Sequence, residues 1–76
     1  RNRVPAELTE RLTAEEARIF RLMLQGKTTK QVGVEMDLSV RTIHYRKKSM
    51  FQKLGVRDRS EAIELVRTIA GESNLI

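Results

Sequence analysis

Four signals that each start a helix are spread along this chain of 76 residues, and they constrain the fold more than any other feature. Each signal begins with a residue whose side-chain oxygen can accept a hydrogen bond from the unpaired backbone N–H groups of a first helical turn. Three also have an acid or amide three residues later, the spacing of a capping box. The starts are Thr13, Thr28, Ser39 and Asp58, and Glu16, Gln31 and Glu61 complete the three boxes. The chain therefore predicts four helices.

Apolar residues recur at helical spacing after each start, and no strand-like alternation competes with them. Gly26, Gly55 and Gly71 follow three of these runs, as expected of residues that end helices. We predict an all-α domain over residues 12–71, with helices at about 14–25, 29–36, 40–54 and 59–70. Residues 1–11 contain Pro5 and little periodicity, which indicates a linker or a loosely docked arm. Residues 72–76 are predicted to be a frayed tail.

The net charge of +5 is concentrated in one segment. Residues 38–57 carry six Lys or Arg and no acid, whereas residues 1–37 are nearly neutral and residues 58–76 are acidic. A solvated surface usually mixes charges of both signs. A surface that binds a polyanion such as DNA avoids carboxylates, and a solvated lysine-rich face is the alternative interpretation.

The second and third predicted helices are separated by only about three residues around Asp37. Two helices on so short a turn, the second basic on its outer face, are typical of a helix-turn-helix. In the third helix Ile43, Met50 and Leu54 fall on one face. His44, Tyr45 and Lys48 fall on the opposite half. Gly33, inside the second helix, is tolerable if another helix must approach closely there.

The stretch from residue 12 to residue 70 resembles the LuxR/NarL/FixJ-type helix-turn-helix domain. The matching motifs are LTxxE at 12–16, QGKTTKQV at 25–32, LSVRTI at 38–43, KLGV at 53–56 and RxEAI at 59–63. The resemblance implies the C-terminal effector domain of a bacterial response regulator or LuxR-type regulator, acting in the cytoplasm. The chain departs from the family pattern at Gly33, His44 and Arg46, so another member's target sequence cannot be transferred to it.

The resemblance also implies roles for particular side chains. DNA bases would be contacted from the third helix by His44, Tyr45 and Lys48. DNA phosphates would be contacted by Thr28, Thr29, Lys30, Arg41, Thr42, Lys47 and Lys53. The fourth helix would form a homodimer, with Leu65 as the candidate contact. Double-stranded DNA and a second copy are therefore the expected partners, and RNA polymerase is a further one.

Other classes of function have weaker support in the sequence. The chain has no cysteine and one histidine, so we expect no metal site, and no cofactor or small-molecule ligand. No nucleophile–base pair or phosphate loop indicates an enzyme. We expect no membrane association, because the third helix needs its apolar face for the core. A helical module that binds an acidic protein partner is the alternative to DNA binding.

Overall fold

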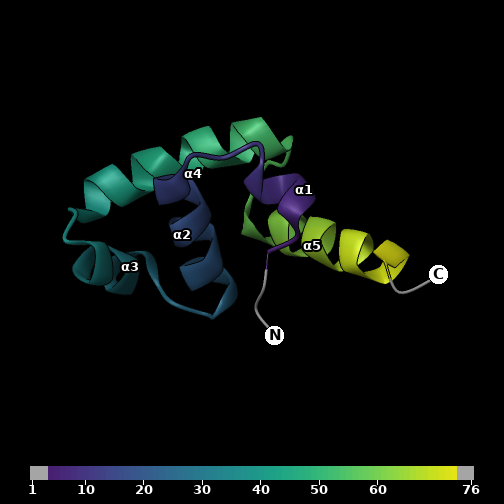
Figure 1. The fold of residues 1–76 in the computed structure, drawn as a ribbon. Helices are drawn as coiled ribbons and strands as arrows, with labels where there is room; N and C mark the ends of the chain where they lie inside the picture. Colours follow the sequence, from purple (N-terminus) through teal and green to yellow (C-terminus); the bar gives the residue numbers. More distant parts are fainter. Residues whose placement is uncertain (1–3, 74–76) are drawn as a thin grey trace.

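The computed structural model describes residues 4–73 of the chain, with side chains described as far as Gly71. This part of the chain is helical and contains no strand, which confirms the all-α prediction. The helices are α1 (Ala6–Thr9), α2 (Ala14–Leu24), α3 (Thr29–Met36), α4 (Val40–Leu54) and α5 (Arg59–Ser73). Helix α4 runs along one side of the molecule, with α2 and α3 packed beneath it and α5 at the far end (Figure 1).

The predicted helix starts are present as hydrogen bonds. The Thr13 and Thr28 hydroxyls each accept from the backbone N–H three residues on, at 3.1 Å, and the Glu16 and Gln31 side chains complete both boxes. The Ser39 hydroxyl accepts from the Thr42 N–H at 3.0 Å. These three local signals place the starts of α2, α3 and α4 where the sequence predicts them.

The start of α5 matches the prediction only in part. Asp58 accepts from the Glu61 N–H at 3.0 Å, as a cap should. The Glu61 carboxylate, however, accepts from the backbone N–H of Arg57 at 2.8 Å instead of returning to Asp58. It also pairs with the Arg57 guanidinium at 3.0 Å, which favours this position of the side chain.

The core lies where α2, α3 and α4 meet. Phe20, Met23, Val32, Ile43 and Met50 are fully buried in it. Ala62 is the fully buried residue of the described part of α5, and its larger apolar side chains are only partly buried. The three inward residues predicted for α4, including Leu54 at 4% exposed, are therefore confirmed.

Gly33 allows the turn between α3 and α4 to pass close to α3. A Cβ atom at Gly33 would lie 2.7 Å from the carbonyl oxygen of Leu38, closer than atoms of a packed structure tolerate. Asp37 adopts the left-handed conformation, with φ 56°, and so reverses the chain. The close approach expected at Gly33 is confirmed: the backbone of the turn lies nearest, and the Ile43 side chain of the neighbouring helix α4 lies 3.7 Å from the same Cβ position.

Both ends of the domain differ from the prediction. Residues 6–9 form α1, and Val4 and Leu8 are buried in the core at 6% and 0% exposed, so this arm is firmly docked. The last helix does not end at Gly71 but continues through it to Ser73. Gly71 does not have the positive φ that ends α4 at Gly55, which explains why it does not act as a terminator. The predicted tail therefore begins inside α5, and residues 74–76 lie outside the described part.

Candidate nucleic-acid interface

Helix α4 presents its three candidate base-contacting residues to solvent. His44, Tyr45 and Lys48 are all exposed, and the Tyr45 side chain is 74% exposed although it is a large aromatic group. Their positions follow from the helical period, because Ile43 and Met50 on the other face are fully buried. The structure therefore brings the three side chains together on one open face.

Two surface hollows lie against this face, and Lys48 lines both of them. The smaller one, of about 320 Å³, is lined by Tyr45, Lys48, Ser49 and Gln52. The larger one, of about 450 Å³, lies between α3, α4 and the start of α5. We call it the basic hollow, and it is lined by Thr29, His44, Lys47, Lys48, Phe51, Arg57, Asp58 and Arg59. Lys48 thus stands on a ridge between two recesses.

Lys47 is half-buried at the wall of the basic hollow. Its Nζ donates a hydrogen bond to the Thr29 hydroxyl at 2.9 Å, which ties α4 to the first turn of α3. Burial, and then the positive charge of Arg59, lower the pKa of Lys47 below its ordinary value. Lys47 therefore lies between the buried face of α4 and its open face.

Four further candidate phosphate contacts, two threonines and two basic residues, lie at the starts of α3 and α4. Thr28 uses its hydroxyl to accept from the Gln31 N–H, and Thr42 accepts from the Ser39 hydroxyl at 2.9 Å. Lys30 and Arg41 are exposed. None of these residues is buried away from a ligand, so all four remain candidates.

Lys53 differs from the other candidates because it forms an ion pair inside the domain. Its Nζ lies 2.8 Å from a carboxylate oxygen of Glu16, which is only 4% exposed. Glu16 also accepts from the Thr13 N–H at 2.9 Å and from the Ser49 hydroxyl at 3.2 Å. Burial raises the pKa of Glu16, but the bonds from Lys53 and Thr13 outweigh it and lower the pKa overall. The pair fastens α4 to the start of α2.

Arg57 and Arg59 line the basic hollow but were absent from the predicted contacts. Arg59 donates to the carbonyl oxygen of Met23 at 3.3 Å, and Arg57 pairs with Glu61. The acid-free segment ends at Arg57, which was a usable signal for that residue. Nothing local in the sequence indicates that the first residue of α5 reaches the same hollow as α3.

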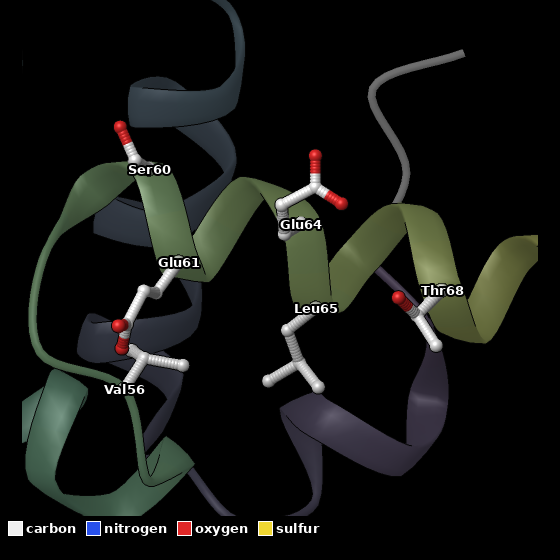
Figure 2. A pocket seen from close by; sticks show the side chains of 6 residues that line it. All are labelled: Val56, Ser60, Glu61, Glu64, Leu65 and Thr68. Atoms are coloured by element: carbon white, nitrogen blue, oxygen red, sulfur yellow. The ribbon is translucent and has the colours of Figure 1, made fainter.

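Leu65, the candidate dimer contact, lines a separate hollow on α5. This hollow is about 350 Å³ and is lined by Val56, Ser60, Glu61, Glu64, Leu65 and Thr68. Leu65 is partly buried against the core, and its side chain extends toward α1 (Figure 2). The exposed surface of this hollow is mostly apolar, and Leu65 and Val56 are the two apolar residues that line it.

Residues 4–73 offer neither a metal site nor a membrane-spanning helix. No group of three or more His, Cys, Asp or Glu residues in this range could hold a metal ion. None of the helices described there has the length and apolar character needed to cross a membrane.

A short turn between two packed helices, the second with an exposed basic face, defines a helix-turn-helix domain. The family model described as bacterial regulatory proteins, luxR family, matches residues 10–66. The chain therefore belongs to the luxR family of bacterial regulatory proteins, which confirms the resemblance found in the sequence.

Several curated proteins are similar to the chain. Spore germination protein GerE of Bacillus subtilis is 42% identical over 57 residues, covering 74% of this chain and 77% of GerE. Transcriptional regulatory protein LiaR of Bacillus subtilis is 36% identical over 53 residues, which are 70% of this chain and 25% of LiaR. Transcriptional regulatory protein UhpA of Escherichia coli is 34% identical over 56 residues, which are 74% of this chain and 27% of UhpA. No solved structure matched the chain significantly.

These matches establish the general class of function. The chain is a DNA-binding domain of a transcriptional regulator family, which is a family of regulators and not of enzymes. Its partner class is double-stranded DNA, and the alternative of a module for an acidic protein is not favoured. The chain spans about a quarter of the length of LiaR and UhpA.

Proposed function

We propose that the domain recognises specific sequences of double-stranded DNA by placing α4 in the major groove. The observation that supports this is the division of α4 into a fully buried apolar face and an exposed face bearing His44, Tyr45 and Lys48. An α-helix fits the major groove, where each base pair presents a distinct pattern of donors and acceptors. Lys48 projects from the ridge between the two hollows and would reach a base edge.

In this proposal the phosphate contacts orient α4 and provide most of the affinity. Exposed Lys30 and Arg41, the hydroxyls of Thr28, Thr29 and Thr42, and half-buried Lys47 are candidates by position. Lys53 is the weakest candidate, because contact with DNA would compete with its ion pair to Glu16. With about six phosphate contacts, the logarithm of the binding constant would fall by about five for each tenfold rise in salt.

The domain acts as a homodimer on DNA in this proposal, through the Leu65 hollow of α5. Two copies would place two α4 helices in successive major grooves, so the target would be a two-fold symmetric or repeated site. Such a domain would serve as the output part of a cytoplasmic regulator, in a two-component response regulator or a LuxR-type protein. RNA polymerase would then be a further partner.

The test begins with a duplex selected from a random library by the protein, followed by titration in fluorescence anisotropy. Replacing Tyr45 and Lys48 together by alanine should lower the ratio of the affinities for the selected and the random duplex at least tenfold. Arg67→Ala on α5 removes one cation far from α4 in sequence and should leave that ratio unchanged. Equal affinity of the double variant and the parent would contradict the proposal and favour the acidic-partner alternative.

The dimer is tested by sedimentation of the protein on the selected duplex. Thr68→Glu places a charge in the Leu65 hollow at an exposed position, so the fold should tolerate it. We expect the parent to bind as two copies and the variant to bind as one. Two bound copies of Thr68→Glu with unchanged affinity would exclude this face as the interface.

A further inference from the structure

The basic hollow combines side chains from three separate elements. Thr29 comes from α3, Lys47 and Lys48 come from α4, and Arg57 and Arg59 flank the start of α5. Asp58 is the one acid in its lining, and that carboxylate already accepts the Glu61 N–H as the cap of α5. The hollow is therefore a concave region with several positive charges and little negative charge to balance them.

Within the described part of the chain, Lys47 and Arg59 lack the carboxylate partner that several basic side chains near them have. Arg46, Lys53 and Arg57 each pair with a glutamate. Among the described residues, no carboxylate pairs with Lys47 or with Arg59. Instead each donates to an uncharged oxygen, Lys47 to the Thr29 hydroxyl and Arg59 to a backbone carbonyl.

Lys47 and Arg59 line the same hollow, and the closeness of two positive charges is unfavourable. The pKa of Lys47 is lowered by burial and also by the charge of Arg59, because a second cation nearby disfavours the charged form of the amine. An anion between them would reverse this cost, because each cation would then face an opposite charge. A hollow with this arrangement favours an anion with several acceptor oxygens.

We propose that Lys47 and Arg59 bind one and the same phosphate group of the DNA backbone in the basic hollow, with the Thr29 hydroxyl as a further donor. This inference rests on the proposed function, since it takes α4 to lie in the major groove. The hollow adjoins His44 and Lys48, so a phosphate bound there would lie beside the base-contacting face. Thr29 can donate its hydroxyl hydrogen to the phosphate while its oxygen still accepts from Lys47.

The shared phosphate would also couple DNA to α5. Arg59 is the first residue of α5, and Ala62 one turn later is fully buried. A phosphate held by Arg59 and Lys47 would therefore fix the start of the helix that carries the Leu65 hollow. Binding of DNA and the placement of the second copy would then depend on the same contact.

The experiment measures the affinity for a random duplex as a function of potassium chloride. The variants are Lys47→Gln, Arg59→Gln and the double variant, with Arg67→Gln as a control that removes one cation outside the hollow. If both cations neutralise one phosphate, the double variant should lower the salt slope by about 0.9 for each bound protomer. Each single variant should lower it by less, because one cation remains on the phosphate. Arg67→Gln should leave the slope unchanged.

Two outcomes would overturn the proposal that Lys47 and Arg59 bind one phosphate. An unchanged slope in the double variant would show that the hollow holds no phosphate, and a loss of about 1.8 for each bound protomer would show two separate phosphates. A slope near zero for the parent protein would instead refute the proposed function itself. If polyglutamate displaced the duplex at equal charge concentration in the parent but not in the double variant, the hollow would be a site for an acidic protein.

A second measurement guards against loss of the fold, since Arg59→Gln removes the bond to Met23. The Lys47 amine is followed by NMR in the parent protein, with and without duplex. Binding of a phosphate should raise the pKa of Lys47, whereas a purely structural lysine should titrate unchanged. An unchanged titration on a fully bound duplex would contradict the proposal without any substitution.

Discussion

Helices α3 and α5 each contain a glycine, and the surroundings of the two glycines are opposite. Gly33 in α3 is buried, with the Leu38 carbonyl where a Cβ would lie, whereas Gly71 in α5 has no neighbouring atom within 4 Å of that point. The region formed by α2, α3 and α4 is closely packed down to its backbone. The outer half of α5 is held by its own helical hydrogen bonds and by partly buried side chains. The closely packed region carries the proposed DNA-contacting face, and α5 carries the proposed surface for a second copy.

The largest expected effect tests how much the stability of the domain around α5 depends on the packing of α1 and the rest of the N-terminal arm. Leu8→Ala removes a fully buried side chain and should lower the free energy of unfolding by about 3 kcal/mol. Glu7→Ala, at the exposed neighbouring position, should change it by less than about 0.5 kcal/mol. Chemical denaturation followed by circular dichroism measures both. A loss below 1 kcal/mol for Leu8→Ala, on the scale expected of core leucines, would mean that the arm is only loosely docked.

The next effect tests the close packing of the turn. Gly33→Ala should cost about 2 kcal/mol, because its Cβ would force apart α3 and the Leu38 backbone. The matched change Val34→Ala, at a position 77% exposed on the same helix, should be almost neutral. Urea denaturation of the two variants separates crowding from helix propensity. If the Gly33→Ala variant were more stable than the parent, the contrast between close packing at Gly33 and open space at Gly71 would be wrong.

A smaller effect tests the attachment of α4 to α2. Glu16→Gln should cost about 1.5 kcal/mol at neutral pH, because it replaces a charge-assisted bond to Lys53 by a neutral one. The pKa of Glu16 is lowered in the folded protein, so its contribution is complete above the unfolded pKa of about 4.3 and is lost as the pH falls through the folded pKa. Stability curves of parent and variant should therefore converge in acid. Glu10→Gln, at an exposed acid outside α2 and α4, is the control, and parallel curves of the parent and Glu16→Gln would contradict this account.

The smallest effect has the opposite sign. Gly71→Ala should raise the free energy of unfolding by about 0.7 kcal/mol, because alanine favours the helix and meets no neighbour. Thermal unfolding should show a small rise in midpoint temperature. A loss of stability would show that Gly71 ends the helix, as the sequence first predicted. Together with Gly33→Ala, this change contrasts the two regions with one type of substitution.

Local signals predicted most of this fold. The helices α2, α3 and α4 each begin after a capping residue whose side chain accepts a hydrogen bond from the N–H three residues later. The bounds of α3 and α4 agree with the prediction for that reason. The arm was underestimated because Val4 and Leu8 are too few to form a periodic pattern, and their burial depends on residues distant in the sequence. Gly71 was misread because a glycine ends a helix only when its φ becomes positive, which the sequence alone does not reveal.

The candidate site shows the same limit. The helical period predicted correctly which side chains of α4 are exposed, because that depends on spacing within one helix. The partners of Lys53 and Arg59 lie more than thirty residues away in the chain, at Glu16 and Met23. Contacts at that distance depend on how helices pack. The charge pattern therefore indicated a basic surface without distinguishing a free lysine from a paired one.

The carboxylate of Glu16 serves two helices at once, and this has an evolutionary consequence. It completes the cap of α2 and also holds Ser49 and Lys53 of α4. During evolution this cap cannot be replaced by another type without also losing the bonds that hold α4. Residues 13, 16, 49 and 53 should therefore change together among descendants of this chain, while the proposed base-contacting positions of α4 diverge freely toward new target sequences.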